Sequence, residues 1–226
     1  MKVRGLYESE MELISKLLYI FYAEGFGEAV RPTIIEDDNP ISAKHQEIIK
    51  SGLFDVDKLL GEYLPEQQTI KLYTECIKNI SEVLSVNIKD LQDVVLLHEF
   101  GHWITHKLPY GEQKEWENYC GNKTNNDVHE GWAQLIAWRV VKDIPILKEV
   151  FCKLNERQSA PYKVWKQFEN SSIITLLLLR ENDCSIATVG HWHLFDDEIK
   201  LNQNSSYEEM KEKLRGATLG GELGIF

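Results

Sequence analysis

Basic side chains are scarce in this sequence. Its 226 residues contain 25 lysines and arginines against 36 aspartates and glutamates, so the formal net charge is −11. Proteins that bind nucleic acids need a basic surface to contact the phosphates. The charge therefore argues against a nucleic acid as the partner.

Long hydrophobic runs are missing as well. No stretch of eighteen apolar residues occurs, so the sequence predicts no membrane-spanning helix and no membrane partner. The N-terminal segment MKVRGLYESEMELISKL becomes acidic before any apolar run, and we expect no signal peptide. The overall composition, 43% hydrophobic and 27% charged, is typical of an ordinary soluble globular protein.

Closely spaced cysteines, repeats and linkers are also lacking. No C-x-x-C pair occurs among the four cysteines, which favours reduced thiols and a cytoplasmic location over disulfides: Cys76, Cys120, Cys152 and Cys184. The chain contains no low-complexity segment, nucleotide-binding loop or nucleophile elbow. We therefore expect residues 1–226 to form a single domain.

Local patterns predict many helices and few strands. Helices are expected over residues 8–23 with an end at Gly25 and Gly27, over one or two short segments within 40–60, over 74–85, and from about 127 to about 182. Strands are expected within residues 29–36, after a turn in residues 62–73, and within 185–195. We expect the tail after residue 200 to be loose.

The segment VVLLHEFGHWITHKL, residues 94–108, contains most of the chemically informative side chains. We expect it to lie on a helix over residues 90–107, because Asp90 suits the N-cap, Asp93 suits the first turn and Pro109 would stop the helix. The apolar residues at its start predict burial on most sides of this helix.

Two histidines of this segment have the spacing of metal ligands. His98 and His102 lie four residues apart, so they share one helix face and both imidazoles reach one tetrahedral zinc ion. Glu99 lies beside them as a general base, which completes the pattern H-E-x-x-H. His106 is about 12 Å and about 80° of rotation from His98, so we expect it at the surface or supporting a ligand. The alternative is three partly buried histidines bonded to neighbours, without a metal.

A third ligand has to come from elsewhere in the chain. The metzincin pattern fails, because Thr105 and Leu108 occupy the positions where it requires glycine and histidine. Glu130, in DVHEGWAQ, follows His102 by 28 residues and lies on a predicted helix of its own. Two alternatives stay open: Glu130 is part of a helix capping box that begins at Asp127, or His129 is the ligand instead.

The two segments together resemble a known family. VVLLHEFGHWI followed by EGWAQ resembles the gluzincins, zinc metallopeptidases with an H-E-x-x-H helix and a glutamate ligand on a later helix. The E-x-x-A-Q-x-x-A pattern from Glu130 to Ala137 is also similar to the small ImmA/IrrE-type metallopeptidases, and the likeness covers about residues 68–140. The resemblance implies an α+β fold, a mostly helical zincin-like domain with a small β-sheet packed on the H-E-x-x-H helix.

The resemblance also implies roles for individual residues. His98, His102 and Glu130 would bind Zn²⁺, and Glu99 would take a proton from a zinc-activated water and return it to the leaving amine. An acidic residue commonly orients the first histidine four positions after the glutamate ligand, but Gln134 is there, whose amide accepts an imidazole N–H without adding charge. Hydrolysis also needs a hydrogen-bond donor to the oxyanion that develops on the substrate carbonyl. The candidate donors are Tyr162, His191, His193, Tyr119 and Arg139.

The sequence thus predicts a zinc-dependent metallopeptidase that acts on a peptide or protein substrate. The strand TIKLY, residues 69–73, resembles the edge strand along which zincin substrates lie, although a plain sheet strand is an equal interpretation. One alternative is a zinc-binding zincin-fold regulatory or binding protein, which the glutamine at position 134 favours. Another is a structural protein without a metal. The oligomeric state does not follow from the sequence.

Overall fold

The computed structural model describes residues 2–23, 31–38, 60–107 and 123–169. Several sequence predictions lie outside these residues. They are the helix end at Gly25 and Gly27, the short helices between 40 and 59, the helix stop at Pro109, the helix beyond residue 170, the strand within 185–195 and the tail after residue 200. The candidate oxyanion donors Tyr119, His191 and His193 also lie outside them.

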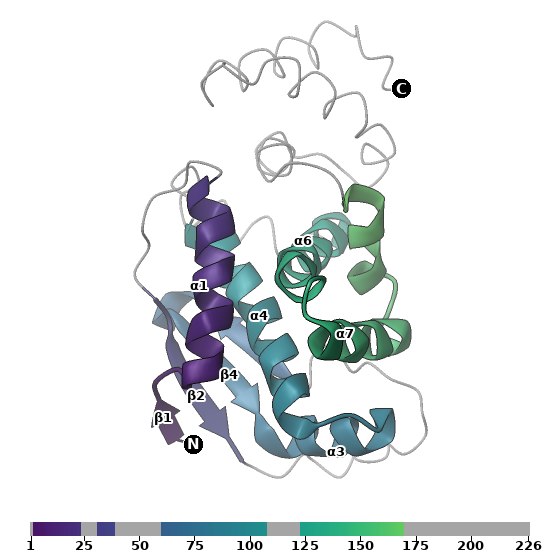
Figure 1. Cartoon of the computed structure of the whole chain (residues 1–226). Coiled ribbons are helices and arrows are strands. Elements are labelled where there is room, and N and C mark those ends of the chain that lie inside the picture. Colours follow the sequence, from purple (N-terminus) through teal and green to yellow (C-terminus); the bar gives the residue numbers. More distant parts are fainter. Residues whose placement is uncertain (1, 24–30, 39–59, 108–122, 170–226) are drawn as a thin grey trace, which may run out of the picture.

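A mixed β-sheet forms one side of the described structure (Figure 1). Its order is β1–β2–β4–β3, where β1 is Lys2–Arg4, β2 is Thr33–Asp37, β3 is Gly61–Leu64 and β4 is Thr69–Tyr73. β2 and β4 run parallel in the centre, and β1 and β3 are the antiparallel edges. The strands predicted within 29–36 and at the end of 62–73 are confirmed.

The edge strand β3 corrects the prediction for residues 62–73. The sequence predicts a turn followed by a single strand, whereas the structure shows a hairpin in which the 3-10 turn Pro65–Gln67 joins β3 to β4. Four residues are too few to show a clear alternation of buried and exposed positions, so β3 gave little signal in the sequence. As a result β4 lies inside the sheet, so of the two equal interpretations of residues 69–73 the plain sheet strand is confirmed and the edge strand is wrong.

Helices make up most of the remaining described structure. They are α1 (Glu8–Ala23), α3 (Thr74–Leu84), α4 (Ile88–Lys107), α6 (Lys123–Val141), α7 (Pro145–Arg157) and the 3-10 helix η3 (Pro161–Phe168). The predicted helices over 8–23 and 74–85 are confirmed. The fold is therefore α+β and mostly helical, with a small sheet, as predicted. None of the described helices combines the length and the apolar character needed to cross a membrane.

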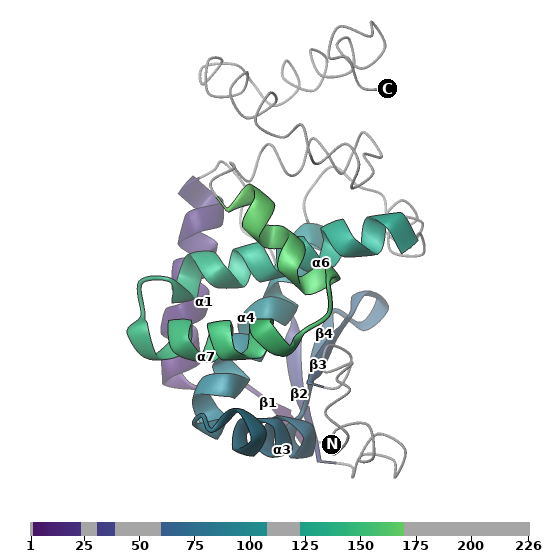
Figure 2. The ribbon, with the colours of Figure 1, turned by 90° about the vertical axis from the view of Figure 1, so that its right-hand side faces the viewer.

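Helix α4 is the centre of this arrangement. It contacts β3 and β4 of the sheet, the helices α1 and α3, and the pair α6 and α7 on its other side (Figure 1). Its residues from Val94 to Ile104 are all buried. A helix that is apolar on most sides is stable only where other elements cover it, so the composition of α4 accounts for its central place. Figure 2 shows η3 lying across α6, against which it packs.

The start of α4 also differs from the prediction. The helix begins at Ile88, and Asn87 is its N-cap: the Asn87 Oδ1 atom accepts hydrogen bonds from the backbone N–H groups of Lys89 (2.8 Å) and Asp90 (3.4 Å). Asp90 therefore lies in the first turn and is not the cap. Asparagine and aspartate are equally good N-caps, so the pattern alone did not distinguish these two starting points.

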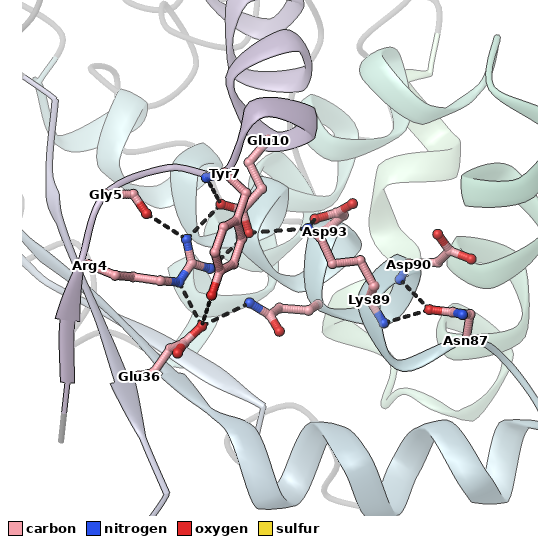
Figure 3. Close-up of polar contacts among 10 residues, drawn as sticks. Arg4, Gly5, Tyr7, Glu10, Glu36, Asn87, Lys89, Asp90 and Asp93 are labelled. Carbon is pink, nitrogen blue, oxygen red and sulfur yellow. Dashed lines mark hydrogen bonds and ion pairs between the residues drawn. The ribbon is translucent and has the colours of Figure 1, made fainter.

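A network of charged side chains joins the N-terminal elements to α4 (Figure 3). The Arg4 guanidinium donates to both carboxylate oxygens of Glu10 (2.6 and 2.8 Å) and to Glu36 (2.6 Å). Glu10 is fully buried and also accepts the backbone N–H of Tyr7 at 2.8 Å, which caps α1. The Lys89 Nζ atom lies 3.5 Å from Glu10. One carboxylate thus connects β1, α1 and α4.

Two residues of α4 extend this network. Asp93 accepts a hydrogen bond from Lys89 Nζ at 2.7 Å, and the Gln92 side-chain amide donates to Glu36 on β2 at 3.2 Å. Burial raises the pKa of Asp93, although the positive charge of Lys89 opposes this shift. These contacts fix the first turns of α4 to the sheet and to α1.

Candidate metal centre

Three side chains predicted to bind metal meet between α4 and α6. The Nε2 atoms of His98 and His102 lie 3.0 Å apart. The Glu130 Oε2 atom, which comes from α6, lies 3.2 Å from His98 Nε2 and 3.3 Å from His102 Nε2. These three residues form a group that is able to hold a metal ion.

The spacing of the three ligand atoms fits a tetrahedral cation. Zinc binds nitrogen and oxygen at about 2.0–2.1 Å, and two ligands at a tetrahedral angle are then about 3.3 Å apart. The observed separations of 3.0, 3.2 and 3.3 Å agree with this geometry. Glu130 Oε2 is buried without a hydrogen-bond partner among the described residues, so hydrogen bonding alone does not explain why the three atoms converge. The donor set therefore fits a divalent cation.

The charges of the site favour the ligand forms of His98 and Glu130. Burial lowers the pKa of His98, which favours the neutral imidazole that binds metal ions. Burial opposes the ionisation of Glu130, yet the charge of His102 and the contacts of both imidazoles hold its pKa well below the usual range. Burial likewise opposes protonation of His102, but the negative charge of Glu130 outweighs it and raises the His102 pKa. The raised pKa of His102 reflects the attraction of Glu130 for positive charge, which a bound cation would also satisfy.

Glu99 lies on the side of α4 that faces β3. A Cβ atom added to Gly61 would lie 3.1 Å from both Cγ and Oε1 of Glu99, so the strand passes directly against this carboxylate. Burial raises the Glu99 pKa to about 8, and a hydrogen bond to the backbone of Tyr63 partly opposes the shift. A carboxylate whose pKa lies near neutrality is suited to accept and return a proton.

The close approach of α4 and α6 depends on Gly101. A Cβ atom at this position would lie 2.7 Å from the Ala133 Cα atom and 3.0 Å from its carbonyl oxygen. Gly101 follows His98 by three residues, and Ala133 follows Glu130 by three. This close contact between the two helices is therefore about one helical turn from the residues of the candidate site.

The alternatives for the third ligand are now distinguishable. Helix α6 begins at Lys123, so Asp127 is inside the helix and the capping box that we considered for Glu130 is wrong. The His129 ring stacks on that of His102, with centroids 4.3 Å apart, and His129 is not a member of the ligand group. The His106 Nδ1 atom lies 2.8 Å from the Tyr63 hydroxyl, so this histidine supports β3 and is likewise outside the group.

Gln134 does not take the position predicted for it. Its side-chain amide donates to the Gln158 Oε1 atom at 2.7 Å. The Nδ1 atoms of His98 and His102 are buried and have no partner among the described residues, so Gln134 does not orient the first histidine through a hydrogen bond. The correction has a physical cause: α7 brings Gln158 within reach of Gln134, which local sequence spacing does not reveal.

Of the candidate oxyanion donors in the described part of the chain, Tyr162 lies at the site. Its ring stacks on His98 with centroids 5.5 Å apart. Arg139 is nine residues beyond Glu130 on α6, which corresponds to about 13 Å along the helix. Sequence reasoning missed Gly61 and Tyr63 as neighbours of Glu99, because it did not recognise the strand that holds them.

Comparison of the chain with protein-family models, with curated proteins and with solved structures gave no match.

Proposed function

We propose that the protein is a zinc-dependent metallopeptidase of the gluzincin type. The observation that carries this proposal is the convergence of His98, His102 and Glu130 from two helices, with Glu99 next to the first ligand. Two imidazoles and one carboxylate are the ligand set of many zinc hydrolases, in which the fourth position stays open. The resemblance of VVLLHEFGHWI and EGWAQ to gluzincins and to ImmA/IrrE-type metallopeptidases supports the same function.

The side chains of the site have separate tasks in hydrolysis. When bound, zinc would supply Lewis acidity toward a water molecule and the substrate carbonyl. Glu99 accepts the proton of the attacking water and passes it to the leaving amine, which its raised pKa favours. His98, His102 and Glu130 would hold the ion. Tyr162, stacked on His98, is close enough to the site to contact a substrate.

The substrate in this proposal is an extended peptide aligned on β3. This strand is an edge of the sheet and lies against Glu99, whereas β4, one candidate for this role in the sequence, is paired with a strand on each side. An extended peptide adds to an edge strand through main-chain hydrogen bonds, which require no particular side chains. Pairing along β3 would bring a peptide bond close to the proton acceptor.

A second candidate is a zinc-binding regulatory protein with little or no proteolytic activity. Gln134 supplies no carboxylate to the ligands, and both Nδ1 atoms lack a partner among the described residues. Outer partners of this kind raise the basicity of ligating histidines. A site without them suits metal binding that is weaker and more easily reversed.

We also propose a cytoplasmic location. Cys76 is buried and Cys152 is exposed, and both are free thiols in the structure. Unpaired cysteines persist where the surroundings are reducing.

The variant Glu99→Gln tests the proposed function. It keeps the size of the side chain but removes the proton acceptor, so zinc content should match the parent while cleavage of an unstructured peptide library slows by a factor on the order of a hundred or more. Mass spectrometry of the products measures cleavage, and elemental analysis measures zinc. The matched control is Glu66→Gln, the same chemical change at an exposed position on the hairpin turn.

Two results would contradict this proposal. Equal cleavage by the parent and by Glu99→Gln would remove Glu99 as the proton acceptor. No cleavage by a zinc-loaded parent across the whole library would favour the regulatory alternative.

A further inference from the structure

Each of the two histidine ligands is covered by one further ring. The Tyr162 ring lies on His98 with centroids 5.5 Å apart and an angle of 27° between planes. The His129 ring lies on His102 at 4.3 Å and 29°. His98 and His102 meet edge to face, at 4.6 Å and 90°. Four rings thus form a row in which the two ligands are the inner pair.

Among the described residues, the usual means of fixing a ligand imidazole is missing. A ligating histidine normally donates its second ring N–H to a carboxylate or carbonyl, which sets the rotation of the ring. The Nδ1 atoms of His98 and His102 have no such partner in the described part of the protein. Within the described part of the chain, contacts other than hydrogen bonds to Nδ1 therefore hold the two rings so that both Nε2 atoms face Glu130.

A buried polar network holds Tyr162 in place. The Asn155 side-chain amide donates to the Tyr162 carbonyl at 2.6 Å, and Trp165 Nε1 donates to Asn155 Oδ1 at 3.2 Å. Asn155 and Gln134 both donate to Gln158 Oε1, at 3.3 and 2.7 Å. Because these amides are buried and bonded, the start of η3 is fixed relative to α6 and α7. The amide of Gln134 therefore acts on the site indirectly, through the segment that carries Tyr162.

The second covering ring is fixed more simply. His129 precedes the ligand Glu130 on α6 and is buried, so the helix that delivers the carboxylate also delivers this ring to His102. The two outer rings come from η3 and α6, and the two ligand rings come from α4.

We infer that Tyr162 and His129 are positioning residues of the metal centre, whose ring faces hold His98 and His102 in the orientation that binds the ion. The inference rests on the metal site of the proposed function. Offset-stacked rings at these distances attract each other, and an imidazole that gives electron density to a metal presents a more positive face to the tyrosine ring. The ring faces thus do the work that hydrogen bonds to Nδ1 do elsewhere.

Four variants of the full chain distinguish the effect of each aromatic ring on zinc affinity from the effect of its polar atoms. Tyr162→Phe and His129→Phe keep an aromatic ring, whereas Tyr162→Leu and His129→Leu remove it. Zinc affinity, measured by competition with a chromophoric chelator, should stay within about twofold of the parent for both phenylalanine variants and fall on the order of tenfold for each leucine variant. The visible spectrum of the cobalt-substituted protein should change in the leucine variants only, because it reports the ligand geometry.

A control variant distinguishes positioning from a general loss of stability. Ile77→Ala opens a cavity in the core beside α3, away from the ligands. It should lower the melting temperature of the metal-free protein and leave the zinc affinity unchanged.

The possible failures are distinguishable. Parental zinc affinity in both leucine variants would overturn the inference and leave the proposed function intact. Losses as large in the phenylalanine variants as in the leucine variants would assign the effect to the tyrosine hydroxyl or to a His129 nitrogen, and would overturn it too. A parent protein that takes up no zinc would overturn the proposed function and this inference together.

Discussion

Glu130 illustrates how a single residue gains its role from distant contacts. The sequence around it fits both a helix cap and a metal ligand. Helix α6 begins before Asp127, which excludes the capping box. The position of α6 beside α4 brings the Glu130 carboxylate to two imidazoles. Each of the three side chains is therefore expected to contribute strongly to the proposed metal binding, because the group that could hold an ion has three members and no spare one among the described residues.

Removal of any one ligand gives a direct prediction. His98→Ala, His102→Ala and Glu130→Ala should each weaken zinc binding at least about 100-fold relative to a parent that holds about one zinc per chain. Elemental analysis after dialysis against a weak chelator measures the effect.

The control for these variants is His106→Ala, which removes a histidine of the same helix that contacts Tyr63 instead of the ligand group. It should keep its zinc. Retention of zinc by His98→Ala together with His102→Ala would show that the ion binds elsewhere in the chain.

The residues of the site differ in how far the sequence predicts them. The four-residue spacing of His98 and His102 is a local property of one helix, and the structure brings their Nε2 atoms together. The third residue of the group was predicted as a choice among alternatives. The partner of Gln134 was predicted wrongly, because its hydrogen bond to Gln158 depends on how α7 packs against α6. Local spacing carries no information about such a contact.

At the scale of elements, the site depends on how closely α4 and α6 approach. Gly101 makes that approach possible, because its missing side chain leaves room for the backbone of Ala133. Glycine is a poor helix former, about 1 kcal/mol worse than alanine. Gly101 thus lowers the stability of helix α4 at the point where the backbones of α4 and α6 meet.

The variant Gly101→Ala is expected to weaken the site despite its better helix propensity. Its methyl group would lie 2.7 Å from the Ala133 Cα atom, so α6 must shift and carry Glu130 away from the histidines. We expect a loss of about 1–3 kcal/mol in the free energy of unfolding, together with weaker zinc binding. Chemical denaturation and chelator competition measure the two effects.

The matched control is Gly5→Ala, because a Cβ atom at Gly5 meets nothing within 4 Å. It should change the stability by less than about 0.5 kcal/mol and leave zinc binding as it is. A Gly101→Ala protein that is more stable than the parent and binds zinc equally well would contradict this prediction. It would show that α6 shifts without loss of stability or of zinc binding.

A helix or strand could be predicted from the sequence where its pattern of apolar residues is local and extends over several turns or residues. The helix over 8–23 matches α1 residue for residue, because its apolar positions recur at helical spacing over four turns. The strand β3 is short and was missed, so the sequence alone did not distinguish an edge strand from an inner strand for β4. The start of α6 was placed four residues late, because Asp127 looks like a cap. Short elements and competing caps account for these errors.

At the scale of the whole molecule, the charged network of Arg4, Glu10 and their neighbours connects the first residues of the chain to the central helix (Figure 3). Glu10 is fully buried and serves Arg4, Lys89 and the backbone of Tyr7 together. Loss of its charge would leave a buried guanidinium with a single carboxylate partner, Glu36.

The variant Glu10→Gln should therefore destabilise the whole fold by about 3 kcal/mol. Its amide keeps the shape of the side chain and one acceptor oxygen, but its NH2 group cannot accept from Arg4, so the variant removes the charge together with one of the two hydrogen bonds to Arg4. Thermal or denaturant unfolding followed by circular dichroism measures the change in the free energy of unfolding.

The control is Glu12→Gln, two residues away on the same helix, where the side chain is 75% exposed and pairs with Lys16 at 3.7 Å. This change should cost less than about 0.5 kcal/mol. If Glu10→Gln proved as mild as Glu12→Gln, Arg4 would be held by Glu36 and solvent alone.

The position of the ligands on two helices also has a consequence for the order of events during folding. His98 and His102 come together as soon as one turn of α4 forms, since they are four residues apart. Glu130, 28 positions beyond His102, joins them only when α6 has formed and docked against α4. A refolding chain therefore assembles this group of three side chains at a late step. In the proposed metal site, the rate of tight ion capture would then measure the docking of two helices, not the formation of either one.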